Sequence, residues 1–184
     1  MELIDKKVVL KTYPFSVEEL SLKIDGNQLP HPYYRLDCPD WVNVLPVTGD
    51  GRAVLIRQIR AGTLKSVLET PGGVLDKHEH RDPTMAAARE LEEETGFTSQ
   101  RILPLCSLNP NPAIMTNRCH FFLALGCVPA TDRKHFPDAE ERISVELVPV
   151  SDLDAMVRTG LIDHSLSALC VMLAFKYLSP PAAR

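Results

Sequence analysis

Three glutamates in this chain are spaced so that they could share one metal ion. Glu90, Glu93 and Glu94 stand at i, i+3 and i+4, so a helix would place them on one face within a single turn. Like charges at these spacings repel by roughly a few tenths of a kcal/mol per pair. A divalent cation would neutralise this repulsion, and carboxylate oxygens suit Mg²⁺ or Mn²⁺ better than Zn²⁺. The alternative for these three residues alone is a solvated helix face.

The residues on either side predict the helix that carries this cluster. Asp82 can accept the first backbone N–H bonds of a helix, and Pro83 suits its first turn, where no donor is needed. Gly96 is a good C-terminal residue. Before the helix, Gly72 and Gly73 allow a close approach of the backbone. We therefore expect the glutamates on a short helix beside a glycine turn.

The other predicted elements indicate a mixed α/β (α+β) domain over residues 41–184. Residues 41–48 and 52–60 are typical of a β-hairpin around Gly49-Asp50-Gly51. Further strands are expected at 67–70, 102–108, 119–127 and 143–148, and a last helix at 165–178. Strands and helices mix without a regular βαβ alternation, which favours this class over a doubly wound sheet.

Residues 1–40 differ from the rest and predict a small antiparallel β-appendage. Residues 7–12 and 20–24 have the partly alternating polarity of short strands, and Asp25-Gly26-Asn27 is a turn signal. Such a hairpin is marginal alone and needs a surface to cover. We expect it to lie in the interface of a homodimer.

Composition excludes several classes of protein. With 184 residues, a net charge of −4 and 24% charged residues, the chain fits one globular domain with no nucleic acid as main partner. The apolar stretch 169–175 is far shorter than the ~20 residues that a membrane helix needs, so no membrane is expected. No secretory signal is visible, and the five cysteines form no C-x-x-C pair. Reduced thiols and a cytoplasmic location are expected.

The helix region resembles a known signature. Residues 89–97, Arg-Glu-Leu-Glu-Glu-Glu-Thr-Gly-Phe, match all seven specified positions in the second half of the Nudix box, R-E-U-x-E-E-x-G-U, where U is aliphatic or aromatic. Glu79 follows Gly73 at the spacing of the box. Nine residues, rather than seven, separate Glu79 from Arg89. The extra residues fall in a loop that tolerates insertion, and they leave the role of Glu79 open.

Features outside the box are similar to one Nudix subfamily, the ADP-ribose pyrophosphatases and nucleoside diphosphate sugar hydrolases. Residues 68–73 resemble the E-x-P-A-G run of that subfamily, and Pro112 lies sixteen residues after Gly96. The resemblance implies a mixed β-sheet between helices and metal-dependent hydrolysis of a pyrophosphate bond. ADP-ribose would give AMP and ribose 5-phosphate, whereas GDP-mannose would give a nucleoside monophosphate and a sugar 1-phosphate.

The resemblance also implies metal-binding and catalytic roles. Its metal ligands would be the Gly72 carbonyl and the carboxylates of Glu90, Glu93 and Glu94, holding Mg²⁺ or alternatively Mn²⁺. Arg89, four residues before Glu93, would orient the carboxylates through an ion pair within the helix. Metal-bound glutamates are poor bases because the cation lowers their proton affinity. The resemblance places the base in the segment 138–141, with Glu141 favoured and Glu140 as the alternative.

Substrate contacts are expected from the strands before the helix. Arg57 and Arg60 carry guanidinium groups that match phosphate oxygens, but residues three apart on a strand point to opposite faces. The resemblance selects Arg60. Glu69 is a candidate for binding a distal hydroxyl or a bridging water. The candidates for stacking on the base are Tyr33, Tyr34 and Trp41.

Other functions remain open on the sequence. A Nudix hydrolase could act on a dinucleoside polyphosphate or an oxidised nucleotide, and a non-catalytic module could sense nucleotide sugars. Loss of metal carboxylates would mark such a sensor, but all three helical glutamates are present. The residues do not rank ADP-ribose against GDP-mannose. His78 and His80 suggest zinc, but no matching Cys or His spacing supports it.

Overall fold

The computed structural model describes residues 1–137 and 142–178. The chain divides into two compact units: residues 1–40 with 108–119, and residues 41–107 with 120–184. The segment 108–119 therefore belongs to the first unit although it follows the first half of the second one along the chain. Sequence patterns alone gave no sign of this long-range association.

The first unit is built on a four-stranded antiparallel sheet. Its strands are β1 (Glu2–Lys11), β2 (Ser16–Ile24), β3 (Asn27–Gln28) and β4 (Tyr33–Asp37), with β2 pairing with the other three. Two strands were expected here; both are longer than expected, and β4 was not predicted. Leu36 N–H donates to the Ile114 carbonyl at 2.7 Å, which attaches the segment 108–119 to β4.

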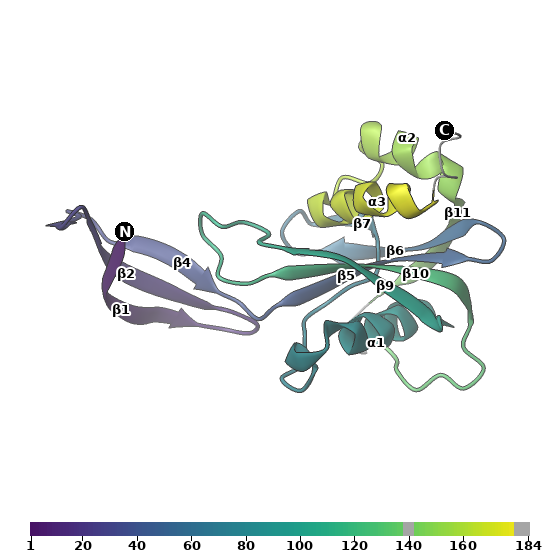
Figure 1. The fold of residues 1–184 in the computed structure, drawn as a ribbon, viewed down its shortest axis with the longest axis horizontal. Helices are drawn as coiled ribbons and strands as arrows, with labels where there is room; N and C mark the ends of the chain where they lie inside the picture. Colours follow the sequence, from purple (N-terminus) through teal and green to yellow (C-terminus); the bar gives the residue numbers. More distant parts are fainter. Residues whose placement is uncertain (138–141, 179–184) are drawn as a thin grey trace. The chain divides into compact units, whose positions relative to one another are not determined.

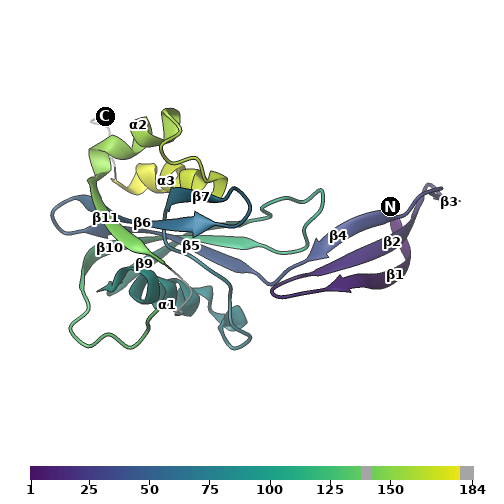
Figure 2. The ribbon, with the colours of Figure 1, turned by 180° about the vertical axis from the view of Figure 1, so that it is seen from behind.

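The second unit is a seven-stranded sheet between helices. The strands run in the order β11-β6-β5-β10-β8, with β7 pairing with β6 and β9 with β10. One face of the sheet is covered by α1 and the other by α2 and α3 (Figures 1 and 2). This arrangement confirms the expected α/β class. The elements are β5 (Trp41–Thr48), β6 (Arg52–Arg60), β7 (Lys65–Glu69), η1 (Glu79–Arg81), α1 (Pro83–Thr95), β8 (Phe97–Thr98), β9 (Arg101–Leu108), β10 (Cys119–Pro129), β11 (Ser144–Pro149), η2 (Val150–Asp152), α2 (Leu153–Arg158) and α3 (Ser165–Leu178).

The core of the second unit fixes α1 against the sheet. Ala86, Ala87 and Leu91 are fully buried on one face of α1 and pack with Val42 and Val44 of β5. Small alanines allow the helix to approach the strand closely, and leucine fills the remaining space. In the part of the chain that the structure describes, no helix is long and apolar enough to cross a membrane.

Candidate active site

Helix α1 begins and ends where the sequence predicts, and this sets the orientation of the glutamates. The Asp82 side chain accepts a hydrogen bond from Thr84 N–H at 3.1 Å, and Pro83 is the first helical residue. Gly96 ends the helix with φ of 71°, a left-handed conformation that favours glycine. Glu90 and Glu94 are 8% and 6% exposed. Two carboxylates are thus held on the buried side of the helix, which excludes a fully solvated face.

The glycine turn lies directly against these carboxylates. Gly72 N–H donates to Glu94 Oε2 at 2.7 Å. A Cβ at Gly73 would lie 2.3 Å from Glu90 Oε1, and one at Gly72 would lie 2.3 Å from the Val42 carbonyl oxygen. The clash at position 72 is with backbone, so the turn requires glycine there, whereas a side chain at position 73 would force the Glu90 carboxylate to move. Backbone bonds to β5, including Val42 N–H to the Gly73 carbonyl at 2.9 Å, hold the turn in place.

Arg89 ties the carboxylates to the loop before the helix. Its Nη1 donates to Glu90 Oε1 at 2.8 Å and to Glu93 Oε2 at 3.1 Å, which confirms the expected pair within the helix. Its Nε and Nη2 donate to the two oxygens of Glu79 at 2.9 and 3.1 Å, and Nη2 also to the Val74 carbonyl at 3.0 Å. The hydrogen bond to Glu79 contributes most to raising the pKa of Arg89 above its usual value.

This geometry answers the question that the loop insertion left open. Glu79 is 2% exposed, and despite the two extra residues in the loop its carboxylate contacts Arg89. Glu79 therefore orients Arg89, which in turn contacts Glu90 and Glu93. Side-chain oxygen or nitrogen atoms of Asp76, His78 and Glu79 also lie within 4.8 Å of one another. Since both Glu79 oxygens accept hydrogen bonds from Arg89, we assign this group no metal.

The donor set around α1 fits a divalent cation. It offers carboxylate oxygens from one helical turn, and oxygen ligands of this kind suit Mg²⁺ or Mn²⁺. The Arg89 contacts hold Glu90 and Glu93, while Gly72 N–H holds Glu94. That the Gly72 carbonyl is a further ligand stays a prediction.

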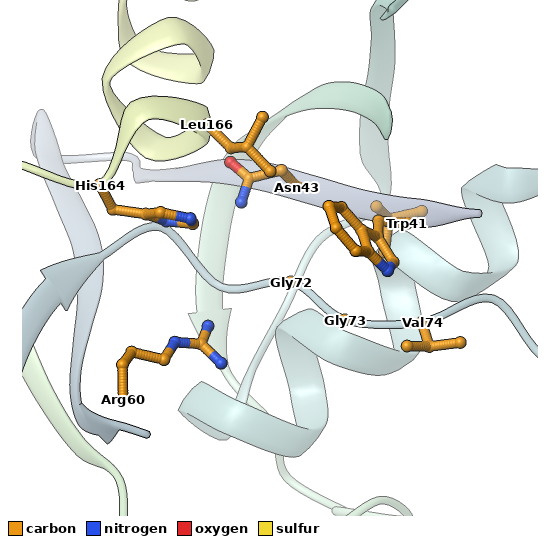
Figure 3. Close-up of a pocket in the computed structure, with 9 residues that line it drawn as sticks. Trp41, Asn43, Arg60, Gly72, Gly73, Val74, His164 and Leu166 are labelled. Atoms are coloured by element: carbon orange, nitrogen blue, oxygen red, sulfur yellow. The ribbon is translucent and has the colours of Figure 1, made fainter. Parts of the chain in front are cut away.

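A pocket of about 280 Å³ opens beside the glycine turn (Figure 3). Arg60, the arginine that the resemblance selected, lines it together with Trp41. Its remaining lining residues are Val42, Asn43, Gly72, Gly73, Val74, His164 and Leu166. A base-stacking candidate and a phosphate-binding candidate are thus brought to the same cavity as the glycine turn.

Arg57 and Arg60 lie on opposite faces of β6, as strand geometry predicts. Arg57 Nε donates to Glu146 Oε1 at 2.5 Å, on the side of β11. Arg60 donates through Nε and Nη2 to the two oxygens of Glu69 at 2.9 and 2.7 Å. Only Arg60 is among the residues that line the pocket. The other stacking candidates, Tyr33 and Tyr34, are half-exposed on β4 of the first unit.

Glu69 is buried at the end of β7, with 1% of its surface exposed. Besides the two bonds from Arg60, its Oε2 lies 3.2 Å from His164 Nδ1. Burial by itself raises the pKa of Glu69, but the hydrogen bonds from Arg60 and His164 outweigh it and lower the pKa to about 2. The carboxylate therefore stays ionised and positions its two partners.

His164 and Asn43 are pocket residues that the sequence analysis did not select. Residues 160–163, Gly-Leu-Ile-Asp, are also similar to the C-terminal third of the Nudix subfamily named above, and His164 follows them directly. This position was a usable signal. Asn43 gave no such signal, because it is a single polar residue in a stretch, Val42 to Val47, whose other residues are apolar side chains and Pro46.

The segment proposed to carry the base, residues 138–141 with Glu140 and Glu141, lies outside the described residues. The chain just before it is attached to the end of α1. Arg133 Nη2 donates to the Glu93 carbonyl at 2.5 Å, and Lys134 N–H donates to Glu92 Oε1 at 2.5 Å. The catalytic roles of both glutamates stay predictions.

The NUDIX domain model matches residues 39–166, and the chain belongs to this family. An ADP-ribose pyrophosphatase from Bacillus subtilis (strain 168) is 28% identical over 175 residues, covering 93% of each chain. A GDP-mannose pyrophosphatase from Escherichia coli (strain SMS-3-5 / SECEC) is 27% identical over 177 residues and 91% of each chain. A methanol dehydrogenase activator from Bacillus methanolicus is 31% identical over 129 residues, 68% of this chain and 69% of its own.

A solved structure described as an ADP compounds hydrolase has the same fold. It superimposes with a TM-score of 0.82 at 22% sequence identity, and the match covers 96% of this chain and 93% of that one. The match extends over residues of both units. It confirms the Nudix fold that the resemblance implied.

Proposed function

We propose that this chain hydrolyses the pyrophosphate bond of nucleoside diphosphate sugars in a reaction that depends on a divalent metal. ADP-ribose would give AMP and ribose 5-phosphate, and GDP-mannose-type sugars would give a nucleoside monophosphate and a sugar 1-phosphate. The observation that carries the proposal is the cluster of Glu90, Glu93 and Glu94 against the glycine turn that borders the pocket. The names of the ADP-ribose and GDP-mannose pyrophosphatase relatives support the substrate class.

We assign Mg²⁺, with Mn²⁺ as a substitute, to the three glutamates and the Gly72 carbonyl. When bound, the ion would neutralise charge on the pyrophosphate and lower the barrier to attack by water. Arg89 holds two of the carboxylates in place, through contacts of 2.8 and 3.1 Å. Within the described residues the ligand atoms of the three glutamates do not all lie within 4.8 Å of one another, so these carboxylates would have to move toward a shared ion.

Arg60 is the group that we assign to the substrate's phosphates. It lines the pocket, and its planar guanidinium offers five N–H donors, of which those on Nε and Nη2 already bond Glu69. Glu69 thereby fixes the orientation of the fork. Glu141 is the proposed general base, with Glu140 as its alternative, because neither is needed as a ligand.

The test is a phosphate-release screen. The purified chain is incubated with Mg²⁺ and ADP-ribose, GDP-mannose and other nucleotide sugars, and the monophosphate products are detected after phosphatase treatment. Dinucleoside polyphosphates and oxidised nucleotides are included as the competing substrate classes. The proposal expects the highest activity with a nucleotide sugar. Activity with the competing classes alone would contradict it, and so would a lack of activity with every compound.

We propose further that the protein is a homodimer joined through the first unit. All ten residues of β1 are exposed, and they include Leu3, Val8 and Leu10, each more than half exposed. An exposed apolar strand is normally covered by a partner. Light scattering at micromolar concentration should give twice the chain mass of 20.5 kDa. A monomer mass would contradict this proposal.

The proposed location is the cytoplasm, with a small-molecule substrate rather than a nucleic acid or a membrane. The net charge of −4 and the odd number of cysteines support both points. Fractionation of cells that express the tagged chain would test the location. Recovery with the periplasmic or membrane fraction would contradict it.

A further inference from the structure

A hydrogen-bond network connects His164 to the buried strand end behind the pocket. His164 lies just before α3 and lines the pocket, and Figure 3 shows its ring extending toward the cavity. Its Nδ1 lies 2.9 Å from Ser167 Oγ and 3.2 Å from Glu69 Oε2. Ser167 Oγ also accepts a bond from Thr70 N–H at 3.1 Å. Ser167 and Glu69 are both buried, so their positions are fixed by packing.

These contacts select one protonation state of Nδ1. An unprotonated Nδ1 would direct its lone pair at an ionised carboxylate oxygen 3.2 Å away, which is repulsive. A protonated Nδ1 donates to Glu69 and Ser167 instead, and a buried carboxylate strongly favours such a donor. Glu69 is kept ionised by the two N–H groups of Arg60 as well. The neutral ring therefore carries its hydrogen on Nδ1 and leaves Nε2 with a lone pair.

An Nε2 lone pair at the pocket wall selects among the groups of a nucleotide sugar. A hydroxyl group can donate a hydrogen bond to it, whereas an ionised phosphate oxygen has no hydrogen to give. We propose that His164 is a specificity-determining residue that accepts a hydrogen bond from a sugar hydroxyl of the substrate. This inference rests on the proposed function and adds a substrate contact to it. Glu69 and Ser167 are positioning residues that act through His164.

The first test compares wild type with His164→Asn and His164→Gln. The Asn amide can keep the N–H toward Glu69 and Ser167 but has no atom at the place of Nε2, whereas the longer Gln side chain can return a polar atom there. Losing one net hydrogen bond should raise KM for ADP-ribose by about 3- to 10-fold, with kcat within about twofold, for His164→Asn. His164→Gln should recover part of the loss.

Substrate analogues identify the hydroxyl. The ethyl ester of ADP lacks the terminal sugar, and a 2′,3′-dideoxy form of ADP-ribose lacks the hydroxyls of the nucleoside. The effect of His164→Asn should disappear with one of these analogues. An equal effect with all three substrates would indicate a merely structural role, and no effect with ADP-ribose would remove the contact. Either result overturns the proposal.

A second measurement does not depend on activity. Nitrogen NMR of the imidazole in the free wild-type chain, labelled with ¹⁵N-histidine and assigned with His164→Asn, reports which ring nitrogen carries hydrogen. At pH 7.5 the result expected is Nδ1–H with an unprotonated Nε2. An Nε2–H form or a doubly protonated ring would overturn the inference. A wild-type chain inactive on all nucleotide sugars would instead overturn the proposed function, and the NMR result would still stand.

Discussion

Glu79→Gln should destabilise the protein far more than the loss of a carboxylate from the surface. The Glu79 carboxylate is buried and accepts hydrogen bonds from Arg89 at 2.9 and 3.1 Å and from Asp76 N–H at 2.7 Å. Burial by itself raises the pKa of Glu79, but the bonds from Arg89 and the Asp76 backbone outweigh it and lower the pKa below 4.5. Glu79 is therefore ionised in the folded protein at neutral pH.

The size of the effect follows from what remains after the substitution. Removing one partner of a buried ion pair costs about 3–5 kcal/mol. Arg89 keeps its bonds to Glu90, Glu93 and the Val74 carbonyl, and a neutral amide at position 79 still accepts one hydrogen bond. We therefore expect a loss of about 2–3 kcal/mol in the free energy of unfolding at pH 7.5. Without the charge of Glu79, Arg89 would also bind the carboxylates of Glu90 and Glu93 more strongly. Mg²⁺ would then compete less well for these carboxylates, so the Mg²⁺ concentration needed for activity should rise.

The pH dependence has a definite sign. Because the folded-state pKa of Glu79 is lowered, its ionisation stabilises the fold above the unfolded pKa of about 4.5 and less as pH falls below that value. The difference between wild type and Glu79→Gln should therefore shrink below about pH 4.5.

The assay is urea unfolding of both proteins at a series of pH values from 7.5 to 4. The matched control is Asp154→Asn, which removes the same charge from a surface ion pair. Asp154 Oδ2 lies 2.7 Å from Arg158 Nε, and the side chains of Asp154 and Arg158 are 45% and 74% exposed. Such a surface pair contributes only about 0–1 kcal/mol. A loss for Glu79→Gln no larger than that of the control, or one independent of pH, would refute the reasoning.

Three further substitutions test other parts of the site. Gly73→Ala places a Cβ 2.3 Å from Glu90 Oε1 and should displace this ligand; a Mg²⁺ titration should show a requirement raised by roughly tenfold or more, and an unchanged requirement would contradict the assignment. Glu69→Gln should lower the free energy of unfolding by about 3 kcal/mol at pH 7. Because the folded-state pKa of Glu69 is about 2, its ionisation stabilises the fold fully above pH 4.5, and this stabilisation is lost toward pH 2. Urea unfolding should therefore show a smaller difference between wild type and Glu69→Gln at pH 3 than at pH 7, and a constant difference would contradict the assignment. Glu141→Gln should lower kcat by roughly 10²- to 10⁴-fold in steady-state assays with little change in Mg²⁺ affinity; a loss with Glu140→Gln instead would move the base by one residue, and no loss with either would place it elsewhere.

Local signals predicted the elements that carry the site. Asp82, Pro83 and Gly96 each act within a few residues of the helix ends, so their chemistry fixed the bounds of α1 without knowledge of the rest of the fold. The alternation of β6 likewise predicted that Arg57 and Arg60 would separate. These inferences needed only the geometry of one helix or one strand.

Contacts between distant segments were beyond such reasoning. The insertion left the role of Glu79 open, and only the folded chain shows it bonded to Arg89. The pairing of Glu69 with His164 joins residues 95 positions apart, from β7 and the start of α3. No periodicity links such pairs, because packing of α3 on the sheet brings them together.

The measurement that tests the central claim most directly is the Mg²⁺-dependent hydrolysis of the preferred nucleotide sugar by wild type and Glu94→Gln. Products are separated by chromatography, and circular dichroism confirms that each protein is folded; Asp154→Asn serves as the control for loss of one charge. We predict Mg²⁺-dependent formation of a nucleoside monophosphate and a sugar phosphate by wild type and the control, and no turnover by folded Glu94→Gln. Turnover by Glu94→Gln equal to wild type with the same Mg²⁺ dependence would contradict the account.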